Sequence, residues 1–312
     1  MRNEISIVIP VFNRGNMICD VLNCVSKQTY RPIHLVLVDN NSFDNTLEIL
    51  NQFKSDNETS DFRITVVEEP RQGAAIARNT GARYVESEWL MFFDSDDKMD
   101  FDLVEKYVQS INSADSDLII VDADYEIGSM KKEFFNVNDN FLENQTVHGF
   151  LSTVRFIVKK ALFDKIDGWN ESLHGWDDWE FGVRLLLDDP KVQRITDSVP
   201  VHVKVHKNSI SGDNFSSKHE WWESAVDEVE KAIKNSMNQN KEKLLKLVEF
   251  RRILLAGNYY KENKFKLAHE LYASTYARVK QDKVMSWLYP LVYRYIGMGG
   301  RGAGRLVKKI VK

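Results

Sequence analysis

The chain has 312 residues and a formal net charge of -4 at pH 7, with 28% charged and 43% hydrophobic residues. A chain of this length can bury a full hydrophobic core, as one large domain with an appendage. The negative net charge argues against a dedicated nucleic-acid-binding protein.

The sequence also predicts where the protein resides and its redox state. An apolar strand pattern begins at residue 5, which leaves no room for a secretory signal, and no apolar run is long enough to span a bilayer. Cys19 and Cys24 do not have the spacing of a metal or redox motif, and we expect both to be reduced. These features favour a cytoplasmic protein.

Strand and helix patterns alternate four times in the first hundred residues. Short apolar, β-branched runs predict buried strands, and apolar residues at helical spacing between them predict helices. The expected strands are 5–10, 33–38, 64–67 and 89–93, and the expected helices begin near residues 18, 42 and 73. This alternation predicts a doubly wound, mostly parallel sheet with helices on both faces.

Polar residues follow three of these strands at their carboxyl ends. Pro10, Phe12 and Asn13 follow the first strand, Asp39 follows the second, and an acidic stretch begins at Asp94. Ligands of such sheets bind at the carboxyl ends of the strands, so we expect these residues to share one edge. No glycine triplet follows the first strand and no Walker lysine loop is present, which excludes the usual dinucleotide and P-loop sites.

The acidic stretch at residues 94–97 contains Asp94, Asp96 and Asp97 directly after the most apolar strand. Three carboxylates so close together would repel one another without a cation. Their hard oxygen atoms suit Mg²⁺ or Mn²⁺ bridging to substrate phosphates. The alternative is a solvated acidic turn before the next helix, and the stretch alone only slightly favours the metal.

The second half of the chain is less regular. We expect strands at 117–121 and 153–158, a variable loop over 128–149, and a helix that carries Trp179, Val183 and Leu186. Beyond residue 217 three helical patterns predict a C-terminal appendage. Its last part, residues 280–312, holds eight basic residues and one acidic residue among many aromatics. This composition fits a segment at an anionic membrane surface, although the aromatics could equally pack on the appendage.

Taken together, five motifs resemble those of the family 2 glycosyltransferases, inverting enzymes of the GT-A fold that use nucleotide sugars. The resemblance runs from about residue 6 to residue 211, and its motifs occupy residues 6–14, 38–42, 73–81, 93–97 and 176–180. It implies a GT-A domain over residues 1–215, with a Rossmann-like, mostly parallel sheet, and a helical C-terminal region over residues 216–312.

The resemblance also implies roles for individual residues. Asp39 would accept a hydrogen bond from the N3–H of uracil, although guanine also offers N–H donors. Asp96 would bind Mn²⁺ or Mg²⁺, and His206, favoured over His202, would be a further metal ligand or a diphosphate contact. Asp178 would be the catalytic base that takes the proton of the acceptor hydroxyl. Trp176 and Asp177 would lie on the acceptor side. The other donor-binding residues implied are Pro10, Phe12, Asn13, Arg78, Asp94 and Lys204.

Three positions depart from the family pattern, two of them being Asp177, where the family more often has Glu, and Lys204, where it often has Arg. The family usually has a glycine where this chain has Asn41, close to the base-binding Asp39.

The sequence therefore predicts a metal-dependent transferase that moves a sugar from a nucleotide sugar to an acceptor hydroxyl. The donor is expected to be a UDP-sugar, and the acceptor a saccharide or lipid-linked saccharide in bacterial polysaccharide or glycolipid assembly. The enzyme would be cytoplasmic, with possible peripheral attachment to the inner face of the cell membrane and no nucleic-acid partner. The alternative is a catalytically silent subunit or sensor that binds nucleotide sugars.

Overall fold

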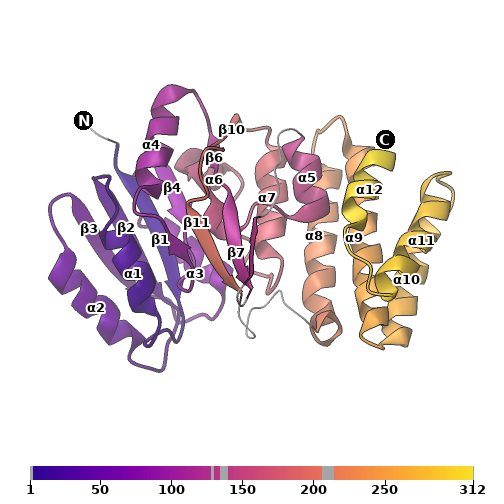
Figure 1. Cartoon of the computed structure of the whole chain (residues 1–312), viewed down its shortest axis with the longest axis horizontal. Coiled ribbons are helices and arrows are strands. Elements are labelled where there is room, and N and C mark those ends of the chain that lie inside the picture. Colours follow the sequence, from indigo (N-terminus) through magenta and orange to yellow (C-terminus); the bar gives the residue numbers. More distant parts are fainter. Residues whose placement is uncertain (1–2, 128–129, 134–139, 206–213, 312) are drawn as a thin grey trace. The chain divides into compact units, whose positions relative to one another are not determined.

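The computed structural model describes residues 3–127, 130–133, 140–205 and 214–311 (Figure 1). The chain divides into two compact units. The first comprises Met1–Asn136, Leu151–His174 and Asp188–Ser209, and the second comprises Val137–Phe150, Gly175–Leu187 and Ile210–Lys312. Each unit has its own hydrophobic core. The domain boundary near residue 215 stays a prediction.

The first unit is built on a seven-stranded sheet with the strand order β10-β6-β9-β4-β1-β2-β3. All neighbouring strands run parallel except β9, which is antiparallel to both β4 and β6. The predicted mostly parallel α/β sheet is therefore confirmed. The strands are β1 (Ile5–Val11), β2 (Ile33–Asp39), β3 (Phe62–Glu68), β4 (Trp89–Phe92), β6 (Leu118–Ile120), β9 (Phe156–Lys159) and β10 (Val192–Arg194).

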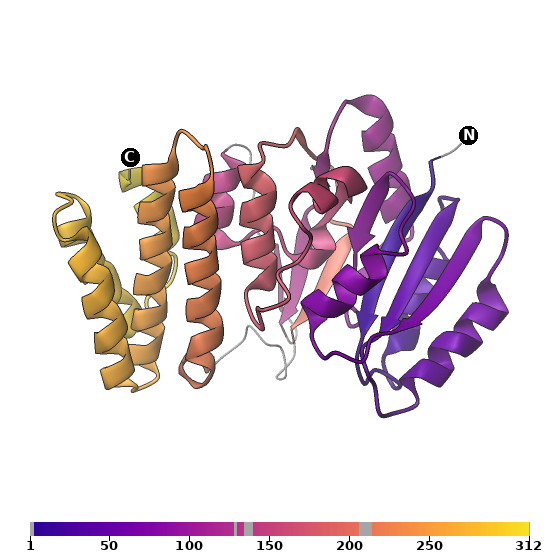
Figure 2. The ribbon, with the colours of Figure 1, turned by 180° about the vertical axis from the view of Figure 1, so that it is seen from behind.

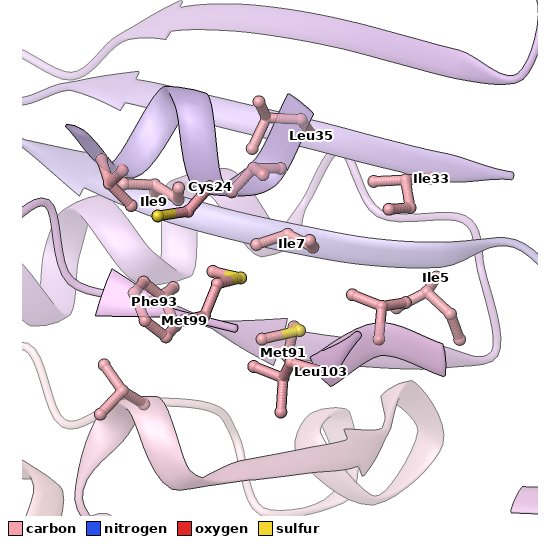
Figure 3. Close-up of a cluster of buried hydrophobic side chains, with 14 of the residues drawn as sticks. Ile5, Ile7, Ile9, Cys24, Ile33, Leu35, Met91, Phe93, Met99 and Leu103 are labelled. Carbon is pink, nitrogen blue, oxygen red and sulfur yellow. The ribbon is translucent and has the colours of Figure 1, made fainter. Parts of the chain in front are cut away.

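Helices cover both faces of this sheet (Figures 1 and 2). Ile5, Ile7 and Ile9 of β1 point to the face that packs on α1 and α4, and Figure 3 shows this cluster. On the other face α3 lies so close that a Cβ added at Gly81 would be 2.4 Å from Val8. The helices of this unit are α1 (Ile18–Ser26), α2 (Thr46–Asn57), α3 (Ala74–Ala82), α4 (Leu103–Ser113), the 3-10 helix η1 (Thr153–Arg155) and α6 (Lys160–Lys165).

A second, four-stranded sheet in the first unit has the order β5-β11-β7-β8. Its strands are β5 (Lys98–Met99), β11 (Val201–Val205), β7 (Ala123–Ile127) and β8 (Met130–Glu133). The expected loop over 128–149 is thus wrong in part, because β8 and helix α5 (Phe141–His148) lie within it. Both elements are short and polar, and so lack the apolar periodicity that predicts structure.

The second unit is helical, as predicted for the C-terminal region. Helix α9 packs against α5, α8, α10 and α11. Leu247, Phe250 and Ile253 of α9 share a core with Leu288 and Val292 of α11. The remaining helices are α7 (Asp177–Leu187), the 3-10 helix η2 (Phe215–Lys218), α8 (His219–Asn235), α9 (Lys241–Lys261), α10 (Phe265–Val279), α11 (Met285–Gly297) and α12 (Ala303–Ile310).

The aromatic residues of α11 divide between the core and the surface. Tyr289 is fully buried, whereas Trp287, Leu291 and Tyr295 are 51%, 54% and 45% exposed. These three residues are four apart and so lie on one helix face. Within the described residues, no helix has both the length and the apolar character needed to cross a membrane.

Candidate active site

Asp39 ends strand β2 and is 2% exposed. Its Oδ2 accepts a hydrogen bond from the backbone N–H of Ser42 at 3.1 Å. Its Oδ1 is buried and has no hydrogen-bond partner among the residues that the structure describes. A buried acceptor without a donor is unfavourable, so this oxygen is suited to an N–H group of a ligand.

The loop after β1 joins the loop after β2 beside Asp39. The backbone N–H of Asn13 donates to Ser42 Oγ at 3.0 Å, and Asn13 Oδ1 accepts the N–H of Phe43 at 3.0 Å. Phe12 meets Phe43 edge to face at 6.0 Å and remains 40% exposed. Asn13 therefore fixes this loop pair, while Phe12 offers an accessible aromatic surface. Pro10 pairs with Val38 of β2, one residue before Asp39.

The turn after Asp39 tolerates the missing family glycine. Asn41 has φ 61°, in the left-handed region that asparagine adopts more readily than most residues. Next to it, the buried Asn40 side chain donates to the carbonyl oxygens of Glu69 and Arg71 and accepts the N–H of Gly73. Asn41 thus adopts a left-handed conformation that a glycine at this position would also allow.

Two arginines meet the acidic stretch that follows β4. Arg78, buried on α3, donates through Nη2 to Asp94 Oδ1 at 2.9 Å and lies over the ring of Trp169 at 4.6 Å. Arg14 donates through Nη2 to Asp96 Oδ2 at 3.0 Å. The stretch thus collects positive charge, as expected for closely spaced carboxylates.

Asp97 points into the protein. It is 5% exposed, and its Oδ1 accepts the backbone N–H of Lys204 at 3.0 Å. Burial, with the negative charges of Asp94 and Asp96, raises the pKa of Asp97 to about 8. The Lys204 ammonium pairs with Asp20 of α1 at 3.3 Å. The acidic stretch is therefore anchored to β11 through Asp97 and the Lys204 backbone.

The acidic stretch has the chemistry to hold a divalent cation. Among the described residues no three His, Cys, Asp or Glu side chains are grouped as a metal site. Mg²⁺ and Mn²⁺ are often held by one or two carboxylates together with water and substrate phosphates. Asp96 and Asp94 can supply the carboxylates. The other predicted ligand, His206, lies outside the described residues.

The residues predicted for the acceptor side lie in the second unit, at the start of α7. Helix α7 begins at Asp177, and its first turn carries Asp177, Asp178 and Glu180, where the helix dipole favours negative charge. Asp178 Oδ1 accepts the backbone N–H of Trp179 at 2.7 Å. Trp176 has φ 54° and packs against Trp179 and Trp222 at centroid distances of 5.5 and 5.3 Å.

Hydrogen bonds from α5 hold the opening of α7. Gln145 Nε2 donates to the carbonyl oxygen of Trp179 at 3.1 Å, and Trp179 Nε1 donates to the carbonyl oxygen of Gln145 at 2.8 Å. Arg184 closes the first turns through an ion pair with the buried Glu180. The backbone that carries Asp178 is therefore firmly fixed within its unit.

Sequence reasoning assigned no role to three residues around these sites. Arg14 follows Asn13 in the first motif. Its position in the loop after a strand could have predicted that it lies at the site. Glu69 follows β3 and is bonded by Arg71 and Thr80, which lowers its pKa to about 2. Arg251 of α9 lies over the rings of Trp176 and Trp179, and its distance along the chain left no local signal.

The family model described as "Glycosyl transferase family 2" matches residues 6–164, just over half of the chain. The chain belongs to glycosyltransferase family 2. The family prediction, and with it the transferase class, is confirmed.

One curated relative and two solved structures are similar to this chain. GlyG, a glycosyltransferase of Streptococcus pneumoniae serotype 4, is 34% identical over 121 residues, which are 38% of this chain and 39% of GlyG. Staphylococcus aureus TarS residues 1–349, solved with UDP-GlcNAc, has a TM-score of 0.71 at 20% identity, covering 98% of this chain and 90% of that one. The mannosyltransferase PcManGT of Pyrobaculum calidifontis, solved with GDP-Man and Mn²⁺, has a TM-score of 0.62 at 16% identity, covering 99% and 84%.

These comparisons differ in what they establish. At 20% and 16% identity, the two solved structures establish the fold, and the predicted GT-A architecture with a C-terminal helical region is confirmed. The match to GlyG covers 39% of that protein, so it supports the family and not a shared substrate. The roles of individual residues in this family 2 glycosyltransferase remain proposals.

Proposed function

We propose that this chain catalyses the inverting transfer of a sugar from a UDP-sugar to an acceptor hydroxyl, assisted by Mn²⁺ or Mg²⁺. The observation that carries the proposal is Asp39, a buried carboxylate at the end of β2 whose Oδ1 has no partner within the described part of the chain. Uracil presents an N3–H group, from which such an oxygen can accept a hydrogen bond. The strand ends next to Asp39 carry the other groups that a nucleoside diphosphate requires.

The donor would be held by groups of the first unit. Asp39 accepts the uracil N–H, the exposed ring of Phe12 lies against the base, and the β1 and β2 loops joined by Asn13 support it. Arg78 and Asp94, already an ion pair at 2.9 Å, bind the ribose and diphosphate region, with Lys204 as a further cation near the acidic stretch. Asp96, with His206, would hold the cation.

The chemical step needs a base and a stabilised leaving group. Asp178 removes the proton of the acceptor hydroxyl while the hydroxyl oxygen attacks the anomeric carbon of the sugar. The bond from this carbon to the diphosphate breaks on the opposite face. Trp176 and Asp177 line the acceptor side in this proposal. A bound divalent cation neutralises the charge that develops on the departing diphosphate.

The variant Asp178→Asn tests this function. It removes the proton acceptor without changing the size of the side chain, so we expect transfer to be lost while UDP still raises the melting temperature as in the wild type. Asp56→Asn, at an exposed position on α2, is the matched control and should keep full activity. Near-normal turnover in Asp178→Asn would remove Asp178 from the mechanism. Wild-type protein that binds UDP-sugars and never releases UDP would favour the silent-subunit alternative.

We further propose that the acceptor is a saccharide or lipid-linked saccharide of bacterial polysaccharide or glycolipid assembly, reached at the inner face of the cell membrane. TarS, a relative 22% identical over 227 residues, is named as a poly(ribitol-phosphate) beta-N-acetylglucosaminyltransferase, which supports the polysaccharide assignment. The exposed face of α11 supports the proposed membrane attachment. It carries Trp287, Leu291 and Tyr295 near exposed arginines such as Arg294.

Sedimentation with liposomes tests the membrane assignment. Replacing Trp287, Leu291 and Tyr295 together by serine should abolish binding to anionic vesicles, whereas Met237→Ser, at a 96% exposed position on another surface segment, should leave it unchanged. Equal binding by all variants, or binding to neutral and anionic vesicles alike, would contradict the membrane assignment without affecting the proposed reaction.

A further inference from the structure

Arg251 of α9 lies against the motif that carries Asp178. Its guanidinium carbon is 4.4 Å from the ring centroids of both Trp176 and Trp179, the two tryptophans that flank Asp177 and Asp178. Such stacking against two rings holds the planar guanidinium in a defined orientation. A residue of the C-terminal helical region thus reaches the first turn of α7.

Space for this guanidinium depends on a glycine. Gly149 follows α5 with φ +65°, and a Cβ at this position would lie 3.2 Å from Arg251 Nη2 and 3.2 Å from Trp179 Cδ1. The left-handed conformation and the close contact both favour glycine here. The turn after α5 therefore leaves room for Arg251 beside Trp179.

Within the described part of the chain, Arg251 forms no salt bridge of the kind that its neighbour Arg252 makes. The Nε of Arg251 has no hydrogen-bond partner among the residues described. Burial lowers the pKa of Arg251 to about 10, and the charge of Asp178 acts in the opposite direction. The Coulombic interaction is mutual, so the charge of Arg251 acts on Asp178 as well.

The next residue of α9 provides a contrast. Arg252 is 2% exposed and binds three carboxylates, Asp227 at 2.6 Å, Glu230 at 2.5 Å and Glu249 at 3.1 Å. Two neighbouring arginines of one helix thus face different surroundings: Arg252 has a complete set of structural partners, whereas Arg251 faces the two tryptophans beside Asp178.

We propose that Arg251 is the positioning residue for the Asp178 carboxylate. The inference rests on the proposed role of Asp178 as the base. A base must be ionised to accept a proton, and a fixed cation beside it keeps it ionised and restricts its orientation. The C-terminal helical region would then contribute to catalysis as well as to stability.

Other charged groups surround this pair. Burial, with Arg251, Lys308 and Arg305 nearby, lowers the pKa of His148 to about 4, so this ring is neutral between pH 5 and pH 8. Burial is the main cause that raises the pKa of Glu180, to which the charges of Glu228 and Asp177 add. The titration must therefore be followed at Asp178 itself and assigned with Asp178→Asn. The groups concerned are Asp177 and Glu180 on α7, His148 on α5, Glu228 on α8, and Arg305 and Lys308 on α12.

Nuclear magnetic resonance of the full chain, labelled with ¹³C at the aspartate carboxyl carbons, measures this effect without turnover. In Arg251→Gln we expect the pKa of Asp178 to rise, because the positive charge that acts on this carboxylate is removed. Arg251→Lys keeps the charge and should restore most of the wild-type value. Arg252→Gln is the matched control: it should lower the melting temperature and leave the titration of Asp178 unchanged.

A second measurement on the wild type keeps the test decisive if Arg251→Gln fails to fold. The ¹⁵Nε signal of Arg251 should shift with the titration of Asp178, and this shift should vanish in Asp178→Asn. The proposal is overturned if the ¹⁵Nε chemical shift of Arg251 does not change as Asp178 titrates. It is also overturned if Arg251→Gln folds and the pKa of Asp178 is unchanged in it. Failure of the proposed reaction would instead appear as wild-type protein that releases no UDP. In active protein, Arg251→Gln should move the acid limb of the kcat profile to higher pH.

Discussion

Replacing Asp39 by asparagine would test the base-binding site most sharply. In the wild type Asp39 Oδ2 accepts the N–H of Ser42, and Oδ1 has no partner among the described residues. An asparagine has one acceptor and one donor in place of two acceptors. If its oxygen faces Ser42, its amide group meets the uracil N3–H donor to donor. If it rotates, the Ser42 N–H loses its acceptor.

The size of the effect follows from this lost hydrogen bond. A hydrogen bond to a charged group contributes about 1.5–3 kcal/mol. Since 1.4 kcal/mol corresponds to a factor of ten, UDP should bind roughly 10- to 150-fold more weakly to Asp39→Asn. Cytosine has an acceptor at N3 where uracil has a donor, so the amide N–H of the asparagine in the variant can bind CDP. The preference for UDP over CDP should therefore fall by more than the loss of UDP affinity alone, or reverse.

Loss of binding in this variant would not result from unfolding. Asp39 is 2% exposed, and a neutral amide there removes the cost of a buried charge with an unpaired oxygen. The melting temperature without ligand should therefore be equal to or higher than that of the wild type. Calorimetric titration with UDP and CDP, each with Mn²⁺, measures the four affinities. UDP affinity within threefold of the wild type, with no gain for CDP, would refute the assigned role of Asp39.

Three further predictions concern packing, pH and metal. Gly81→Ala should lower the free energy of unfolding by about 1–3 kcal/mol, the usual cost of overpacking, because its Cβ would lie 2.4 Å from Val8 and 2.9 Å from Val38; an unchanged urea midpoint would disprove this contact. Glu69, whose pKa falls from 4.5 to about 2 mainly through Arg71, should stabilise the fold above pH 4.5 and lose this contribution as the pH falls toward 2. Urea unfolding at pH 5 and pH 3 should therefore show a smaller loss of stability in Glu69→Gln than in the wild type, and equal losses would argue against it. Removal of divalent metal with EDTA should weaken the binding of UDP, measured by calorimetry, and leave the weaker binding of uridine unchanged, because the cation would contact only the phosphates of the ligand. Parallel losses of affinity for both ligands would contradict a cation at Asp96.

Most of the first unit, with the proposed nucleotide site, could be predicted from the sequence. Buried β-branched runs such as β1 and β2 indicate parallel strands, and parallel strands bring Pro10, Asp39 and Asp94 to one edge of the sheet whatever the intervening helices contain. The turn at Asn41 was the open question. It keeps a left-handed conformation because asparagine tolerates one.

The rest depends on contacts between distant segments. Strand β9 is antiparallel in an otherwise parallel sheet, a direction that its apolar sequence does not encode. The contact of Arg251 with Trp176 and Trp179 joins α9 to α7, and an arginine in a helical pattern usually lies on a solvated face. The ion pairs of Arg14 and Arg78 with Asp96 and Asp94 likewise require the folded sheet.

The most direct test of the central claim is to follow donor hydrolysis by ¹H NMR, with UDP-α-hexoses and Mn²⁺ and no acceptor, so that the acceptor need not be known. The account predicts that the wild type releases UDP and that the free sugar appears first as the β-anomer, before mutarotation, while Asp178→Asn releases none. Release of the α-anomer first would contradict inversion. Equal release by Asp178→Asn would contradict the assigned base, and no release from any donor would contradict transfer from a UDP-sugar.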